Sequence, residues 1–166
     1  MMLGFLKVRE NIPKDVMERM YVEILASHVA DRVRTLMTNL IRDMNRLAGM
    51  EFVPSDQAEP GDFRPSDAID EGKSSLLRII DFIKERQASL INTPWLEIFN
   101  RMLDKLISLY EVFRNNRLEF IRDDSKLKTW FTEAAGELNV IRESIALSIN
   151  VEKERFERTY KKYVAG

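Results

Sequence analysis

His28, the single histidine of this 166-residue chain, is the first side chain to consider for catalysis. Asp31 follows it by three residues, a spacing that places both side chains on one face of a helix. A histidine base oriented by a carboxylate is a common acid–base arrangement. However, His28 stands where the surrounding pattern expects an apolar residue. We therefore interpret it as a half-buried structural histidine.

Pairs of carboxylates three residues apart are the second candidate, because several oxygens on one helix face can bind Mg²⁺. These pairs are Asp15/Glu18, Asp67/Asp70 and Glu154/Glu157. Glu71 extends the middle pair into an acidic cluster, but acids at the start of a helix also favour the helix dipole. A Mg²⁺-dependent nucleotide hydrolase of the all-α type needs a second motif on the next helix, and that helix has none. This activity is the third functional hypothesis.

The residue types exclude most other chemistry. Without Cys the chain has no thiolate metal site, thiol redox centre or disulfide. It has no Glu-x-x-His motif, which excludes a ferritin-like di-iron bundle. It also lacks a Gly-rich phosphate loop and a nucleophile elbow. We therefore predict no catalytic residue, no metal and no cofactor, and we expect that the protein is not an enzyme.

Basic side chains form the remaining candidate site. The net charge of −1 divides unevenly, because residues 51–71 hold seven acids and one base and the rest carries +5. We expect several basic residues to converge at one end of the fold: Arg42, Arg46, Arg114, Arg117, Arg122, Lys126 and Lys128. Contact with phosphates there would make the chain an accessory subunit of a nucleic-acid-handling complex, the second hypothesis. The opposing interpretation is that the acidic loop folds over that end and neutralises it.

Helices must position all these side chains, because apolar residues recur every three or four positions and no alternating run indicates a strand. We predict a single all-α domain over residues 1–166. Short connections favour an up-down-up-down four-helix bundle. Residues 50–65, rich in Pro, Gly and acids, form the one long loop. Residues 1–12 are an apolar segment that we expect to pack on the domain.

Start and stop signals give approximate helix bounds. The first helix is predicted from near Pro13 to just before Gly49, and the fourth to start after Asp124 or Ser125 and run to about Val164. Both are distinctly longer than the second, predicted to start after Ser66 or Asp67 and run to about Asn92, and the third, which follows Thr93-Pro94. One end of the bundle should therefore carry a two-helix extension.

The first helix has an unusual pattern, because its apolar residues fall in adjacent pairs every four positions. A period of four turns the apolar stripe by about 40° per repeat on a helix of 3.6 residues per turn. Either the helix breaks or bends between Ser27 and Arg34, or its halves face different neighbours. We favour the second possibility, with one neighbour in another subunit.

The fourth helix carries a short second apolar face opposite its core stripe. Together the two helices suggest an interface made of Val29, Val33, Met37, Ile41, Val140, Leu147 and Val151. The leading hypothesis is thus a non-enzymatic protein-interaction module that forms a homodimer, as a subunit or adaptor of a larger complex. The sequence shows no membrane-spanning stretch and no signal peptide, so we expect a cytoplasmic location.

Overall fold

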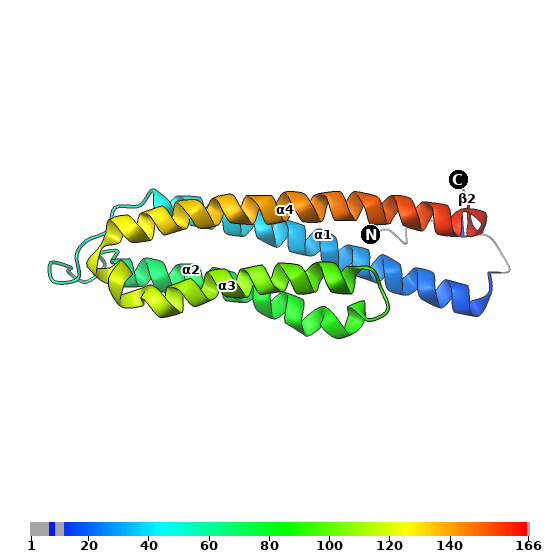
Figure 1. Cartoon of the computed structure of the whole chain (residues 1–166), viewed down its shortest axis with the longest axis horizontal. Helices are drawn as coiled ribbons and strands as arrows, with labels where there is room; N and C mark the ends of the chain where they lie inside the picture. The colour runs from blue at the N-terminus through cyan, green and yellow to red at the C-terminus, as the bar shows by residue number, and fades with distance from the viewer. Residues whose placement is uncertain (1–6, 9–11, 166) are drawn as a thin grey trace.

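Four antiparallel helices make up most of the computed structural model, which describes residues 7–8 and 12–165 (Figure 1). The helices are α1 (Lys14–Ala48), α2 (Pro65–Arg86), α3 (Trp95–Arg122) and α4 (Asp124–Tyr160). The first and fourth have 35 and 37 residues, against 22 and 28 for the second and third. The predicted all-α four-helix bundle with long outer helices is confirmed.

Three short elements complete the described part of the chain. A 3-10 turn, η2 (Gln87–Leu90), leads out of α2, and a second, η3 (Lys161–Tyr163), follows α4. Strands β1 (Lys7–Val8) and β2 (Val164–Ala165) form a minimal antiparallel pair. None of the described helices is both long enough and apolar enough to cross a membrane.

Two helices start one to three residues earlier than predicted. Helix α2 begins at Pro65, which suits a first helical position because its missing N–H needs no partner there. Asp67 therefore lies inside the helix, where its carboxylate accepts a hydrogen bond of 3.0 Å from the backbone N–H of Arg64. Helix α4 is capped by Asp123, whose carboxylate accepts a hydrogen bond of 3.2 Å from the N–H of Ser125.

The predicted ends of the second and fourth helices also need correction. Helix α2 ends at Arg86 and continues only as η2, so the prediction of Asn92 is too late. Asn92 has a positive φ of 65°, which a continuing helix does not allow. Helix α4 ends at Tyr160 rather than near Val164, which belongs to β2.

Helix α1 is continuous, so the predicted alternative of a break near Ser27 is wrong. Its halves do face different neighbours, but both neighbours belong to the same chain. Between Ala26 and Leu47 the buried residues alternate spacings of four and three, the repeat of a helical bundle. These residues are Ala26, Ala30, Val33, Met37, Leu40, Met44 and Leu47. Before Ala26 the buried residues Val16, Met20 and Ile24 follow the period of four.

The N-terminal part of α1 and the C-terminal part of α4 form a two-helix extension, here called the stem. Its separate apolar cluster consists of Val16, Met20, Ile24, Phe156 and Tyr160. Figure 1 shows the stem projecting beyond the α2–α3 hairpin. Ile12 packs against this cluster. Residues 1–6 and 9–11 of the predicted N-terminal apolar segment lie outside the described residues.

The main core is closely packed beside Gly72 in the first half of α2. Phe113 of α3 and Phe131 of α4 are fully buried there, with ring centroids 5.7 Å apart. A Cβ atom at Gly72 would lie 3.0 Å from both rings, closer than ordinary packing allows. Glycine at this position therefore allows α2 to approach the two aromatic rings.

Candidate interaction surfaces

The candidate catalytic pair lies in the middle of α1. His28 and Asp31 are both half-buried, and a carboxylate oxygen of Asp31 lies 3.7 Å from the guanidinium of Arg34 on the same helix. Across the described residues, no group of three or more His, Asp or Glu side chains is arranged to hold a metal ion. The carboxylate of Asp31 thus lies beside a basic residue of its own helix.

The acidic cluster at the start of α2 has structural partners in place of a shared cation. Asp67 binds the backbone of the helix's own first turn. Asp70 accepts a hydrogen bond of 2.8 Å from Arg117 of α3, and Glu71 forms an ion pair with Arg46 of α1. Because each carboxylate points to a different partner, the cluster joins α2 to its two neighbours.

The basic residues meet at the end of the bundle where α1 ends and α4 begins, as predicted, and acids meet them there. Besides the two pairs of the acidic cluster, Glu51 of the long loop lies 3.8 Å from Lys128. The ammonium of Lys128 also lies 5.3 Å from the ring centre of Phe52 in the same loop. The loop thus reaches the basic end through two adjacent residues.

Local contacts engage most of the other basic residues at this end. Arg114 pairs with Glu111 at 3.3 Å, and Lys126 pairs with Glu119 at 2.5 Å. The hydrogen bond to Glu119 raises the pKa of Lys126. Five of the seven predicted anion-binding residues therefore form ion pairs.

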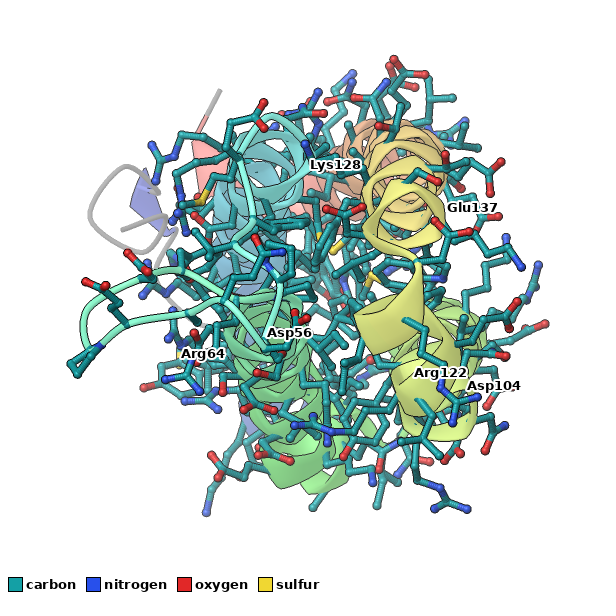
Figure 2. All side chains as sticks on the ribbon, turned by 90° about the vertical axis from the view of Figure 1, so that its left-hand side faces the viewer. Asp56, Arg64, Asp104, Arg122, Lys128 and Glu137 are labelled. Carbon is teal, nitrogen blue, oxygen red and sulfur yellow. The ribbon has the colours of Figure 1, made fainter. Side chains whose placement is uncertain are left out.

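The last two members of the predicted set differ from these five. Arg42 donates a hydrogen bond of 3.3 Å to Asn39. Arg122 is exposed and, within the described ranges, forms no ion pair. Figure 2 shows why: the loop that carries Asp56 lies on the α1–α2 side of this end, across from Arg122. Two arginines without an ion pair are a small surface for a phosphate backbone.

The predicted interface on α1 needs correction. Val33 and Met37 are fully buried in the core of their own chain, so neither forms a free surface. Val29 and Ile41 are partly buried and pack against the same core. The reason is the change to bundle spacing after the stem, which directs this part of α1 toward α2, α3 and α4.

The predicted residues on α4 are exposed. Val140, Leu147 and Val151, here called the α4 stripe, show 62%, 68% and 58% of their surface. Their spacings of seven and four, with Ser144 between the first two, follow the heptad pattern of a helix–helix seam. The stripe is therefore an outward-facing apolar seam on the longest helix.

A second apolar stripe on the stem was not among the predicted interface residues. Met17, Tyr21 and Leu25 of α1 are 48%, 49% and 39% exposed. Each follows a buried stem residue in the chain, so the adjacent pairs of the sequence are one inward and one outward residue. The pairing was the available signal, but it does not say which member of each pair faces outward.

A groove follows the seam between α3 and α4 and was also not predicted. It consists of three adjoining hollows, and neighbouring hollows share lining residues. The middle hollow is the largest of the three and has a volume of about 720 Å³. Its lining residues are Asp104, Lys105, Ser108, Leu109, Val112, Trp130, Glu133, Glu137, Val140 and Ile141. We call the whole depression the α3–α4 groove.

Where the stem begins, a charged network joins α1 to α4. Arg155 donates hydrogen bonds of 2.9 Å to Glu23 and 2.8 Å to Glu152. Burial lowers the pKa of Arg155, but these two carboxylates outweigh burial and raise it overall. Burial, followed by the charge of Glu23, raises the pKa of Tyr160. Because Arg155 of α4 bonds to Glu23 of α1, the network links the two helices. The adjacent cavity has a volume of only about 80 Å³.

No protein family, characterised protein or solved structure matches this chain in the comparisons with known proteins.

Proposed function

We propose that this chain is a non-enzymatic protein-interaction module that pairs with a second copy of itself, as a subunit or adaptor of a larger cytoplasmic assembly. The observation that carries the proposal is the α4 stripe. Its three aliphatic side chains are each more than half exposed, along about 17 Å of one helix face. An apolar seam with heptad spacing is typical of a helix that packs on another helix.

Two-fold symmetry makes a second copy the natural occupant of this seam. In an isologous contact the same patch serves both partners, so the stripes of the two copies together contribute six aliphatic side chains. Fully burying a Val or Leu side chain contributes about 1.5–3 kcal/mol, against the cost of association. Antiparallel packing of α4 on its copy would place Leu147, the most exposed member, near the centre of the contact.

The alternatives have less support. The carboxylates that would hold Mg²⁺ in a nucleotide hydrolase bind basic side chains or a helix terminus instead. Most of the basic residues that would contact nucleic acid are engaged in ion pairs. The α4 stripe, in contrast, is left exposed by the residues that the structure describes.

The test is the mass of the protein in solution by light scattering at micromolar concentration. We expect the wild-type chain to be a dimer and Leu147→Glu/Val151→Glu to be a monomer, because two carboxylates would face each other across the seam. Leu118→Glu is the matched control, since Leu118 of α3 is 69% exposed and lies outside the stripe. This control should remain dimeric.

A second variant tests the stem stripe separately. Leu25→Glu introduces the same charge on α1, and we expect it to remain dimeric. If Leu25→Glu dissociates the dimer and Leu147→Glu/Val151→Glu does not, the contact lies on α1 and the assignment to α4 is wrong. Circular dichroism on each variant separates dissociation from unfolding.

A further inference from the structure

We propose that the α3–α4 groove binds a basic amphipathic helix of a different protein. This interaction is separate from self-association, because the groove is a long hollow between two helices and the α4 stripe is an outward seam. Val140 lines the edge of the groove and is the one residue that both surfaces share.

The length of the groove suits a helix. Its lining runs along α3 from Ile98 to Phe120, about 33 Å at 1.5 Å per residue. The end hollow beside Ile98 shares Lys105 and Ile141 with the middle one. The middle hollow shares Val112 and Trp130 with the hollow beside Phe120. The depression is therefore continuous, and a partner helix of about 18 residues would fill most of it.

The floor of the groove is apolar. Leu109 and Ile141 are almost fully buried, and Val112 and Trp130 are half-buried between α3 and α4. The ring centroid of Trp130 lies 3.9 Å from that of Phe113, which fixes the indole in place. Helices that dock in such grooves insert apolar side chains spaced three and four residues apart. A fixed aromatic side chain in the floor is a typical anchor for this contact.

The rim of the groove determines the charge of its partner. Asp104 of α3 and Glu133 and Glu137 of α4 are exposed around the middle hollow, which contributes one basic residue, Lys105. Throughout the part of the chain that the structure describes, these three carboxylates form no ion pair. The end hollows add Arg101 and Lys126, and each of these forms an ion pair with a glutamate. Figure 2 shows Asp104 and Glu137 extending from the same side of the bundle, one from each helix.

Three unpaired acids around an apolar floor complement a helix with basic flanks. Charges at the rim mainly select the partner and accelerate association, while the buried apolar contacts supply most of the affinity. A second copy of this chain is a poor occupant, because its own acidic rim would face these carboxylates. A basic helix from another protein meets both requirements.

The first experiment uses two labelled synthetic peptides. One has 18 residues, with leucines at spacings of three and four and lysines elsewhere; the other has glutamate at each lysine position. Fluorescence anisotropy should show that the lysine peptide binds at least tenfold more tightly, with affinity that falls as salt rises. Equal binding of both peptides would show unspecific apolar contact and overturn the proposal.

The second experiment locates the peptide. Glu133→Lys/Glu137→Lys should weaken binding of the lysine peptide at least tenfold. Glu154→Lys/Glu157→Lys makes the same change in charge on α4 outside the groove and should change binding less than twofold. If the two double variants weaken binding equally, the peptide senses only net charge and the groove is not its site.

The groove and the dimer contact are separable in the same assay. The lysine peptide should bind Leu147→Glu/Val151→Glu as tightly as the wild type, whatever the mass of either protein. Failure of the dimer test would leave peptide binding intact, and failure of the peptide test would leave the dimer intact. Loss of peptide binding in Leu147→Glu/Val151→Glu would place the peptide on the α4 stripe and contradict the assignment to the groove.

Discussion

The basic end of the bundle and the α3–α4 groove are both rich in charge, but among the described residues their charges are paired to different degrees. At the basic end, Arg46, Arg117 and Lys128 meet carboxylates from α2 and the long loop. At the groove, Glu133 and Glu137 of α4 flank an apolar floor and form no ion pair with a described residue. The first region holds helices together, and the second remains open for a partner.

The difference shows that the number of charges in a region is a poor guide to binding. The seven basic residues formed a candidate anion-binding site in the sequence, yet acids of the same chain engage five of them. The acids of the groove are fewer and widely spaced in the sequence. They form a candidate site because the packing of α3 and α4 leaves them unpaired beside exposed apolar surface.

Two glycines give the largest expected contrast between the closed end and the open side. Gly72→Val should lower the free energy of unfolding by about 1–3 kcal/mol, because the new side chain overlaps Phe113 and Phe131. Gly136 lies on α4 with open space around its Cβ position. Gly136→Ala should therefore raise the free energy of unfolding by about 0.5–1 kcal/mol. Urea denaturation measures both.

This pair of variants tests whether α2 is pressed against the aromatic core. If Gly72→Val unfolds with the same free energy as the wild type, α2 can move away from Phe113 and Phe131 at no cost. The packing at this end would then not be tight. If Gly136→Ala instead lowers the free energy of unfolding, the side of α4 at Gly136 must be covered in solution. In that case the mass of the variant would show whether a second copy covers it.

Removing the acids of the closed end should have a smaller effect on stability. Asp70→Asn/Glu71→Gln breaks two partly exposed ion pairs, each contributing less than about 1 kcal/mol. The freed Arg46 and Arg117 should then bind a short DNA duplex more tightly than the wild type does. A gel shift across a salt series measures this gain, which should fade as salt rises. If the wild type already binds as tightly as the variant, the end is open.

The cap of α4 should give the smallest effect, a shift with pH. The hydrogen bond from the Ser125 side chain, followed by backbone hydrogen bonds, lowers the pKa of Asp123. A lowered pKa in the folded state adds stability above the ordinary value near 3.8, and this stability is lost as pH falls through the lowered pKa. Hydrogen exchange at the Ser125 amide should therefore accelerate at acidic pH beyond its intrinsic trend.

A neutral cap is the control for this shift. Asp123→Asn retains an oxygen that accepts the Ser125 N–H but removes the titration. Hydrogen exchange at the Ser125 amide should accelerate less at acidic pH in this variant than in the wild type. The same acid response in both proteins would assign the effect to another group.

The sequence predicted the helices well because their signals are local. Pro13 and Gly49 mark the ends of α1, and spacings of three and four mark the buried faces. The length difference between the outer and inner helices was enough to predict the stem. Helix ends were less accurate where a 3-10 turn follows a helix, as at Arg86, because such a turn shows no distinct periodicity.

The surfaces were harder to predict because they depend on which helix packs where. Val33 and Met37 belong to an apolar stripe that needs a neighbour, and the sequence does not say whether that neighbour is in the same chain. The groove depends on the distance between α3 and α4, which no local pattern encodes. The α4 stripe was found because it lies opposite a clear core stripe on one helix.

Self-association through the α4 stripe determines the mass of the wild-type protein in solution. Light scattering at micromolar concentration should give twice the chain mass of 19.5 kDa, and Leu147→Glu/Val151→Glu should give the single-chain value. A wild-type protein that remains at 19.5 kDa as its concentration rises would contradict the claim.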